Sequence, residues 1–312
     1  MNGNCDKNLN LWMQAIQLVG KYQKLFITGC PKSGTTWMAR LLNGHPEIVV
    51  HGEGRFAWRM YGFLEGGMFN FRQDHEEHHG CPLVVPTTHE FALLIRAMTD
   101  YIFFRYLTTG GKPTETVRVL ADKTPQHIVC AKELRMLYPT CRFINIVRDP
   151  RDAATSALFH LGKNSSRPKA EFLHEFIDET WRLHVDAAIK AENDFGPEAI
   201  LNIRYEDLHR DEASVLQKCL TFLGVDASDA SIRACSQAGS FELLSGGRKR
   251  GQVDPDSFFR KGIVGDWINH IEPELAQRCC GRVGDSMARF GYANATPEKS
   301  IFLLRPRMAN AA

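Results

Sequence analysis

Phosphate-binding chemistry is indicated by the glycine-rich stretch at positions 29–37, which reads GCPKSGTTW. It follows a short apolar run at 25–28 and precedes a helical pattern that begins at Trp37. A strand, a tight glycine turn and a helix N-terminus direct free backbone N–H groups and the positive end of the helix dipole at one spot. A positive charge and hydroxyl donors join them from Lys32, Ser33, Thr35 and Thr36. The stretch therefore predicts a cradle for the phosphate groups of a nucleotide.

The position of the lysine bears on which nucleotide this is. Gly29 and Gly34 have the spacing of the nucleoside-triphosphate loop G-x-x-x-x-G-K-[ST]. That loop has its lysine directly after the second glycine, whereas this chain has Thr35 there and carries Lys32 inside the loop. The departure argues against ATP or GTP as the ligand. A glycine turn that binds nothing is the plain alternative.

The run Pro31–Trp37 resembles the signature of the sulfotransferases. That family uses the loop to hold the 5′-phosphate side of 3′-phosphoadenosine 5′-phosphosulfate (PAPS), its sulfuryl donor. The resemblance implies that the donor is bound by Lys32, Ser33, Gly34, Thr35, Thr36 and Trp37, with Trp37 on one face of an adenine slot. It also implies a P-loop-like sulfotransferase fold.

A second segment, residues 146–156, resembles the part of the sulfotransferases that grips the 3′-phosphate. By that match Arg148 and Ser156 are the ligands. A permanently charged guanidinium and a hydroxyl about two helical turns later can converge on one phosphate. The alternative is a capped junction between a strand and a helix, with Asp149 or Asp152 serving the helix N-terminus.

A third segment, RKGIVGDW at 260–267, matches the family pattern in which an Arg-Lys-Gly run closes over the 3′-phosphate. The residues implied are Arg260, Lys261 and Gly262, and a basic surface turn is the alternative. Tyr205 and Phe241 match aromatic residues that lie near the adenine, although each could instead belong to the core. The basic loop at 246–251 either folds over the bound nucleotide or is a solvated run of charges.

The implied reaction transfers a sulfuryl group from PAPS to a hydroxyl or amine and releases adenosine 3′,5′-bisphosphate (PAP). Lys32 would stabilise charge on the leaving oxygen. A sulfuryl group carries less negative charge than a phosphoryl group, so no metal is required by this argument. A PAPS-binding protein that has lost transfer is the alternative. The acceptor could be a small molecule, a carbohydrate or a peptide.

An acceptor hydroxyl needs a general base. Many sulfotransferases of phenols and steroids place a histidine in a K-T-H segment, where this chain reads Lys123-Thr124-Pro125. Sulfotransferases of tyrosyl or sugar hydroxyls resemble this chain in having a glutamate soon after the cradle helix, which is Glu53 here. A partly dry cleft can raise the pKa of such a carboxyl enough for it to act as a base.

Other candidates for this role remain open. His51 is the second candidate for the base and Asp122 the third, and Lys123 is expected to contact the acceptor or the sulfuryl group. The alternative for Glu53 is a turn carboxylate paired with Arg55.

Apolar runs that alternate with helical patterns predict the elements needed to position these groups. Strands are expected at 25–28, 48–50, 117–121, 142–147 and 199–203, and helices at 9–19, 90–107, 169–193, 211–223 and 228–237. The 90–107 helix places Leu94, Ile95 and Met98 on one apolar side. The pattern indicates an α/β fold with a central parallel sheet flanked by helices. We expect one domain over 1–312, with a substrate-covering insert at 55–115 and a loosely attached tail from about 295.

Composition narrows the setting of the protein. The 312 residues carry a net charge of +2, which gives no reason to expect nucleic acid or an acidic membrane as the partner. The nine cysteines form no C-x-x-C pair, and the sequence shows neither a signal peptide nor a spanning apolar run. These features predict a cytoplasmic protein with reduced thiols. The oligomeric state stays open.

Overall fold

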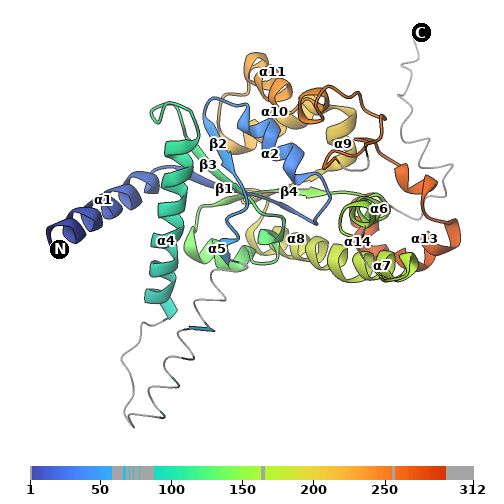
Figure 1. Ribbon diagram of the computed structural model, residues 1–312, viewed down its shortest axis with the longest axis horizontal. Coiled ribbons are helices and arrows are strands. Elements are labelled where there is room, and N and C mark those ends of the chain that lie inside the picture. The colour runs from blue at the N-terminus through green and yellow to red at the C-terminus, as the bar shows by residue number, and fades with distance from the viewer. Residues whose placement is uncertain are drawn as a thin grey trace.

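The computed structural model describes residues 2–57, 88–162, 166–254 and 257–292, together with positions 66, 67, 70, 73 and 77. Much of the expected insert at 55–115, and the whole of the expected tail, lie outside these ranges. The described elements form the predicted α/β architecture, a parallel sheet with helices on both faces (Figure 1).

Five parallel strands make up the sheet, in the order β2-β3-β1-β4-β5. They are β1 (Gln23–Gly29), β2 (Ile48–His51), β3 (Val119–Lys123), β4 (Arg142–Val147) and β5 (Ile200–Arg204). The central strand β1 pairs with β3 on one side and β4 on the other, so the direction of winding changes there. Ligands of open α/β sheets bind beyond the carboxyl ends of the strands at such a switch point. The loop after β1 therefore occupies that position.

The sheet separates two apolar cores because successive side chains of a strand point to opposite faces. In β1, Leu25 and Ile27 pack into one core and Phe26 into the other. All three are fully buried, as expected for a parallel strand that is covered on both faces.

One face of the sheet is covered by the helix after β1 and by three successive helices after β5 (Figure 1). They are α2 (Thr35–Asn43), α9 (Tyr205–Arg210), α10 (Glu212–Leu223) and α11 (Asp229–Ala238). Two short elements follow them in the chain, α12 (Phe241–Leu244) and the 3₁₀ turn Asp266–Asn269.

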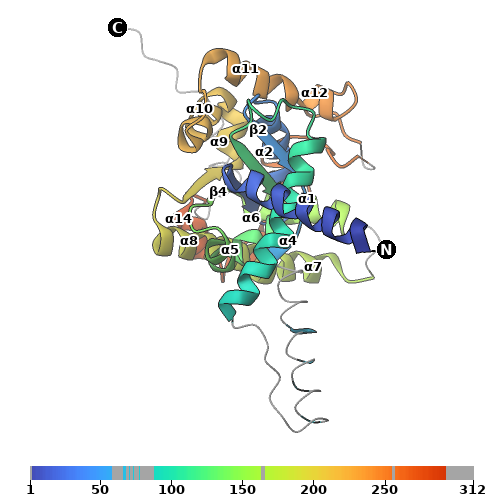
Figure 2. The same ribbon diagram turned by 90° about the vertical axis from the view of Figure 1, so that its left-hand side faces the viewer.

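The opposite face is covered by helices from five separate parts of the chain (Figure 2). They are α1 (Asn2–Gly20), α4 (Thr88–Thr109), α5 (Ala131–Leu137), α6 (Pro150–His160), α7 (Lys169–Glu175), α8 (Arg182–Phe195), α13 (Pro273–Cys280) and α14 (Gly284–Arg289). A 3₁₀ turn at Pro125–Ile128 precedes α5, and a π-helical segment at Phe176–Trp181 joins α7 to α8. The expected helix at 169–193 is therefore three consecutive helical segments.

The apolar sides of the N-terminal helices differ from the prediction. In α4, Ile95 is buried, but Leu94 and Met98 are 53% and 42% exposed. In α1, Val19 packs into the core, but Leu9 and Met13, which share its helical spacing, are 52% and 50% exposed. Helix α1 packs mainly against α4 rather than against the sheet, so only part of its surface is covered (Figure 2). Among the described residues, no helix has both the length and the apolar character needed to cross a membrane.

Candidate active site

The loop after β1 has the geometry of a phosphate cradle. Gly34 lies directly before α2 with φ +102°, a conformation that favours glycine. A Cβ atom at this position would lie 2.6 Å from Cδ2 of Tyr205, so the glycine also allows close packing. Ser33 and Thr35 are buried, and Thr36 is half-buried. The free N–H groups of the first turn of α2 are therefore presented beside these hydroxyl groups.

Lys32 is the cation of this loop. Its Nζ lies 4.2 Å from the centroid of the Phe258 ring. Burial, and then the positive charges of Arg148 and Lys123, lower the pKa of Lys32 to about 8. The ammonium group is thus repelled by neighbouring positive charges, and a bound anion would offset this repulsion.

Arg148 follows β4 and crosses to the cradle loop. Its Nη1 donates to the Lys32 carbonyl at 3.3 Å and its Nη2 to the Ile263 carbonyl at 3.1 Å. The guanidinium Cζ lies 4.3 Å from the centroid of the Tyr205 ring. The Nε atom is buried and has no hydrogen-bond partner within the described parts of the chain. Arg148 is therefore fixed in place with a donor left over.

The helix after Arg148 shows what the two nearby carboxylates do. Asp149 is the N-cap of α6 and accepts from the Arg151 backbone N–H at 2.9 Å. Asp152 instead accepts from the backbone N–H groups of Gly265 at 2.6 Å and Trp267 at 3.0 Å. It therefore attaches the 260–267 segment to α6, a contact between residues more than one hundred positions apart.

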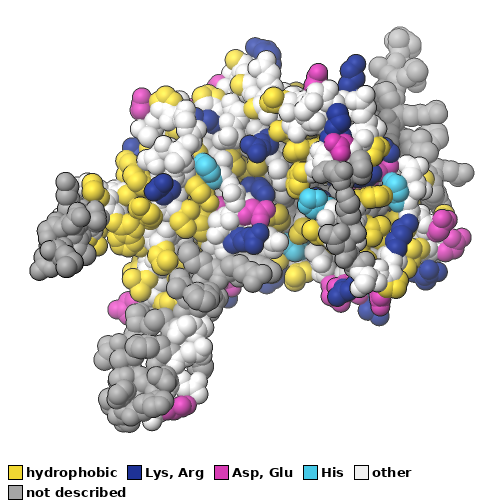
Figure 3. Space-filling view, viewed as in Figure 1, with side chains coloured by type: hydrophobic (Ala, Val, Ile, Leu, Met, Phe, Trp, Pro, Cys, Tyr) yellow, Lys and Arg dark blue, Asp and Glu magenta, His cyan; other side chains and the backbone are white. Residues whose placement is uncertain are grey.

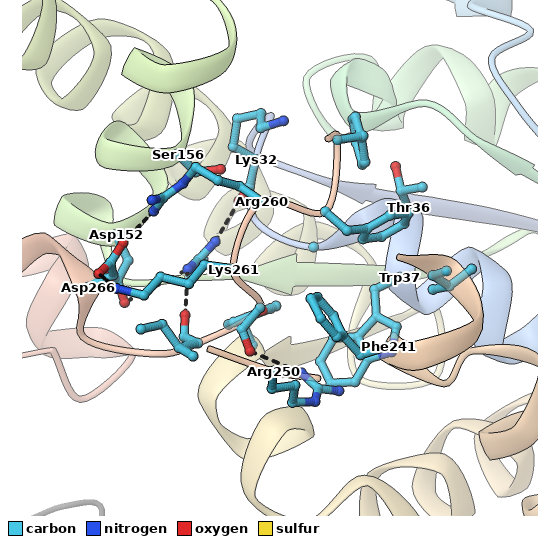
Figure 4. A pocket seen from close by; sticks show the side chains of 18 of the residues that line it. Lys32, Thr36, Trp37, Asp152, Ser156, Phe241, Arg250, Arg260, Lys261 and Asp266 are labelled. Carbon is cyan, nitrogen blue, oxygen red and sulfur yellow. Dashed lines mark hydrogen bonds and ion pairs between the residues drawn. The ribbon is translucent and has the colours of Figure 1, made fainter. Parts of the chain in front are cut away.

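The Arg-Lys-Gly segment brings two more cations to the same cavity (Figure 4). Arg260 and Lys261 both pair with Asp266, Lys261 at 2.7 Å. Although burial raises the pKa of Asp266, the hydrogen bonds from Lys261 and Arg260 outweigh it and leave the pKa well below its usual value. Gly262 has φ +64°, and a Cβ there would lie 2.4 Å from Cε2 of Phe241. Figure 4 places these cations at the opposite end of the cavity from Phe241.

An aromatic slot forms that opposite end. Trp37 donates from Nε1 to the Gly239 carbonyl at 3.0 Å, which fixes its ring. Phe241 lies beside it in Figure 4, and Tyr205 contacts it edge to face with ring centroids 5.6 Å apart. Arg250 occupies the slot, with Cζ 4.6 Å from the Trp37 ring centroid and 5.5 Å from that of Phe241.

The basic loop at 246–251 is ordered by one of its arginines. Arg248 donates to backbone carbonyl groups of Ser245, Gln252, Phe259 and Arg260. Arg248 therefore holds the loop together, and Arg250 is the residue that reaches the slot. Sequence reasoning identified the loop as basic but did not identify Arg250, because no local pattern indicates which arginine turns inward.

The cavity is narrow in this structure. Its volume is about 110 Å³, whereas ligand sites commonly measure roughly 300–1,000 Å³. Arg250 and Phe258 both line it. A nucleotide can enter only if these two side chains move. The main chain of the 246–251 loop can stay in place during this movement, because the hydrogen bonds of Arg248 hold it.

A second hollow lies beside this cavity and shares Thr36 with it. It contains His51, Glu53 and Lys123, which the sequence singled out for the acceptor side. The Glu53 carboxylate accepts from Lys123 Nζ at 2.7 Å and from Arg55 Nη2 at 3.0 Å. Half-buried His51 stacks on the Tyr106 ring with centroids 4.5 Å apart.

The raised pKa that the sequence suggested for Glu53 is not found. Burial raises the pKa of this carboxyl, but the hydrogen bonds and charges of Lys123 and Arg55 outweigh it and hold the pKa below its ordinary value. The pairing with Arg55, which the sequence offered as the alternative role of Glu53, is present. Asp122 has the raised pKa instead, about 6, because burial outweighs its hydrogen bonds.

Asp122 has a structural role. It is fully buried and accepts from Thr124 Oγ1 at 2.6 Å, from the Gly54 N–H at 2.8 Å and from the Tyr106 hydroxyl at 3.0 Å. These bonds tie the segment after β2 to the end of β3. A fully buried carboxyl with three donors is poorly placed to reach an acceptor hydroxyl.

Metal ions in proteins are held by sets of ligand side chains such as His, Cys, Asp and Glu. Over the described ranges, no group of three or more His, Cys, Asp or Glu side chains is arranged to hold a metal ion.

The geometry defines an α/β protein with a phosphate cradle at the switch point of its sheet, and comparisons with known proteins identify the family. The model of the sulfotransferase family matches residues 24–229. The nodulation protein NoeE of Sinorhizobium fredii is 28% identical over 86% of this chain and 65% of its own length, so the chain spans just under two thirds of that relative. Cytosolic sulfotransferase 3 of Arabidopsis thaliana is 24% identical over 71% of this chain and 81% of its own length.

Solved structures show the same fold. Mouse sulfotransferase SULT7A1, crystallised with PAP, matches with a TM-score of 0.55 and 21% identity over 92% of this chain and 93% of its own. A sulfotransferase from Alicyclobacillus acidocaldarius matches with a TM-score of 0.51 and 18% identity over 86% and 93%. This chain belongs to the sulfotransferase family.

Proposed function

We propose that the chain transfers a sulfuryl group from PAPS to an acceptor hydroxyl or amine. The observation that carries this is that one cavity, which Arg148 also lines, has Arg260 and Lys261 at one end and Trp37 and Phe241 at the other, with the cradle beside both (Figure 4). A nucleotide with phosphates on both sides of its ribose suits that arrangement. Family membership and the PAP complex of the mouse relative support the same donor.

Each end of the donor has its own residues in this proposal. The 5′ side is held by Lys32, Ser33, Gly34, Thr35 and Thr36, and the 3′-phosphate by Arg148, Ser156, Arg260, Lys261 and Gly262. Adenine lies between Trp37 and Phe241, near Tyr205, after Arg250 has moved aside. Because Arg260 and Lys261 already share Asp266, that carboxylate keeps them correctly placed before the phosphate arrives.

Transfer is in line. A new bond forms between the acceptor oxygen and sulfur as the bond from sulfur to the 5′-phosphate oxygen breaks, and PAP leaves. Lys32 stabilises the charge that develops on this leaving oxygen. The acceptor proton passes to Glu53, which lies in the adjoining hollow.

Lys123 interacts with both Lys32 and Glu53. It is close enough to Lys32 to lower the pKa of that residue, and it also pairs with Glu53. A sulfuryl oxygen that accepts a hydrogen bond from Lys123 would weaken its pair with Glu53 and raise the pKa of Glu53. Donor binding would in this way prepare the base.

Donor binding should take up a proton. Lys32 in the free protein is protonated below about pH 8 and loses its proton above that pH. Phosphate and sulfuryl oxygens raise its pKa toward the ordinary value, so the complex keeps the proton. PAP affinity should therefore be highest below pH 8 and fall by up to about tenfold per pH unit above it. Calorimetry in buffers of different ionisation enthalpy measures the uptake, and Lys32→Met should abolish it. Proton release, or the same uptake in the variant, would contradict the assignment.

Glu53→Gln tests the base. The amide keeps the size of the side chain but cannot take the acceptor proton, so we expect kcat to fall about a hundredfold or more. PAP affinity, measured by calorimetry, should stay unchanged because Glu53 does not line the nucleotide cavity. His51→Gln is the matched variant from the same hollow. A Glu53→Gln enzyme with near wild-type turnover, together with loss in His51→Gln, would assign the base to His51.

The alternative is a PAPS-binding protein without transfer, which is favoured by Pro125 at the position of the family's K-T-H histidine. A screen with sulfur-labelled PAPS separates the two. Label appearing in an acceptor, or slow hydrolysis of PAPS to PAP, supports transfer. Tight PAP binding with neither outcome supports the alternative.

The acceptor is a hydroxyl or amine on a small molecule, carbohydrate or peptide, and nucleic acid is not the proposed partner. We place the enzyme in the cytoplasm. The seven cysteines whose side chains are described are all unpaired thiols, which suits a reducing compartment.

A further inference from the structure

The hollow beside the nucleotide cavity is polar. We call it the acceptor groove, and the residues that give it this character are Thr36, Arg40, Asn43, His51, Glu53 and Lys123. Thr36 lines both the groove and the nucleotide cavity, so a molecule in the groove meets the cradle directly. Figure 3 shows Lys and Arg side chains gathered in the middle of this face, over α2, with Asp and Glu side chains beside them.

Arg40 is the cation in the groove that has no partner among the described residues. Thr36, Arg40 and Asn43 are spaced four and three positions apart in α2 and therefore share one side of the helix. Lys123 is occupied by Glu53, and the Asn43 Oδ1 accepts from the Val50 N–H at 2.9 Å. The exposed Arg40 guanidinium has neither a hydrogen bond nor an ion pair within the ranges that the structure describes.

The charge balance around Arg40 is positive. The groove contains the cations Arg40 and Lys123 and a single carboxylate, Glu53, which also pairs with Arg55 outside the groove. Burial lowers the pKa of His51, so this ring is neutral at pH 7 and does not repel a cation or an anion. The groove thus has an excess of positive charge at the position of Arg40.

We propose that the acceptor carries an anionic group, namely a carboxylate, sulfate or phosphate, that binds to Arg40 while its hydroxyl lies beside Thr36. This rests on the proposed function, since it assigns the second substrate of the same site. Side chains four positions apart on a helix have Cβ atoms roughly 6 Å apart. The anionic group therefore lies about one helical turn from the reacting hydroxyl, a separation found within one sugar acid or one hydroxyaryl acid.

Arg40 is a specificity residue in this proposal and does not touch the reacting atoms. Its contact with the acceptor is present before and during transfer, so removing it raises KM and leaves kcat nearly unchanged. Because the guanidinium is exposed, the preference for anionic acceptors weakens as salt concentration rises. Arg40 also lies in the last turn of α2, where a cation stabilises the helix, and the controls must separate the two roles.

Binding of matched probes to the PAP-loaded protein is the first test. The pairs are methyl galacturonide with methyl galactoside, and 4-hydroxyphenylacetate with 2-(4-hydroxyphenyl)ethanol, and in each pair a carboxylate replaces a neutral hydroxymethyl group. NMR titration should show tighter binding of at least one anionic member, with shifts of the α2 amides that line the groove. Arg40→Ala should weaken that binding about tenfold, and Arg40→Lys should retain most of it. Neutral probes should bind all variants alike.

Arg278→Ala is the matched control. Arg278 is an exposed arginine in the last turn of α13 and lines neither the nucleotide cavity nor the groove. If helix stabilisation were the whole role of Arg40, both variants would lower the melting temperature and neither would change probe binding. Arg40→Glu should reverse the preference, so that the neutral member of the pair binds more tightly.

The outcomes separate this inference from the proposed function. If calorimetry shows that the wild-type protein does not bind PAP, before any probe is added, the proposed function itself is refuted. PAP binding with no preference for either anionic probe, or with a preference that Arg40→Ala leaves intact, would overturn the role of Arg40 alone. For any acceptor that is turned over, a KM increase confined to anionic substrates supports the inference, whereas an equal increase for the neutral partner contradicts it.

Discussion

Lys32→Met is expected to lower kcat by about 10²–10³-fold, the effect of removing a group aimed at charge that develops in the transition state. The ammonium lies in the cradle loop, and it is the cation whose pKa responds to both Arg148 and Lys123. Its positive charge therefore stabilises the transition state, in which negative charge develops on the leaving oxygen beside it, more than the bound donor. Single-turnover measurement of label transfer with saturating PAPS isolates this step from donor binding and product release.

The fold should tolerate this change. The folded-state pKa of Lys32, about 8, is below the ordinary lysine pKa of 10.5, so at neutral pH burial of the charged form costs stability. Methionine removes this cost and keeps an apolar contact with Phe258. We therefore expect a melting temperature equal to or above that of the wild type at pH 7, and PAP affinity should fall much less than kcat. A variant that loses only PAPS affinity, with kcat preserved, would limit Lys32 to binding the donor.

The sequence could predict three groups of residues that line the nucleotide cavity because each group comes from a short contiguous motif. The cradle from Lys32 to Trp37 follows β1 and Arg148 follows β4, two strands that are clear in the sequence, whereas the Arg260–Gly262 run lies in irregular chain and is indicated by its motif alone. In a parallel sheet the carboxyl ends of the strands meet at one edge, which brings such motifs together. The structure indeed places all three in one cavity.

Contacts between motifs could not be predicted in the same way. Asp152 was a candidate helix cap from local spacing, but it binds the backbone at Gly265 and Trp267. Arg250 enters the aromatic slot because of a loop conformation that Arg248 fixes through four carbonyl groups. Neither arrangement leaves a periodic signal in the chain.

The same limit explains why the raised pKa expected for Glu53 is not found. A carboxyl in a cleft has a raised pKa only when burial outweighs the nearby cations. Lys123 is seventy positions away in the sequence, and the parallel alignment of β2 with β3 brings it to Glu53. In α4, Leu94 and Met98 follow a helical period but are exposed. The spacing of apolar residues shows that they share one side of a helix, but it does not show whether another element covers that side.

Arg148→Gln is expected to weaken PAP binding by about 10²–10³-fold, the usual result of removing one member of a buried, hydrogen-bonded charge pair. AMP, which lacks the 3′-phosphate, should bind the variant within about threefold of the wild type, because the side chains of the cradle are unchanged. PAP and AMP affinities of this variant can be compared because the charged residues near Arg148 keep their other hydrogen-bond and ion-pair partners. Asp152 keeps its two backbone donors, and the Arg260 and Lys261 pairs with Asp266 do not involve Arg148.

Arg148→Lys separates charge from geometry. Lysine keeps the positive charge but loses the planar fork and the donor at Nε, which is buried and unpartnered within the described chain. Its PAP affinity should therefore lie between those of the wild type and Arg148→Gln. The measurement is calorimetric titration of each protein with PAP and with AMP. If AMP affinity falls as far as PAP affinity, Arg148 supports the cradle through the Lys32 carbonyl rather than binding the 3′-phosphate. If the ratio between the two ligands collapses, the 3′-phosphate is bound at Arg148, and selection of PAPS over other adenine nucleotides follows from that contact.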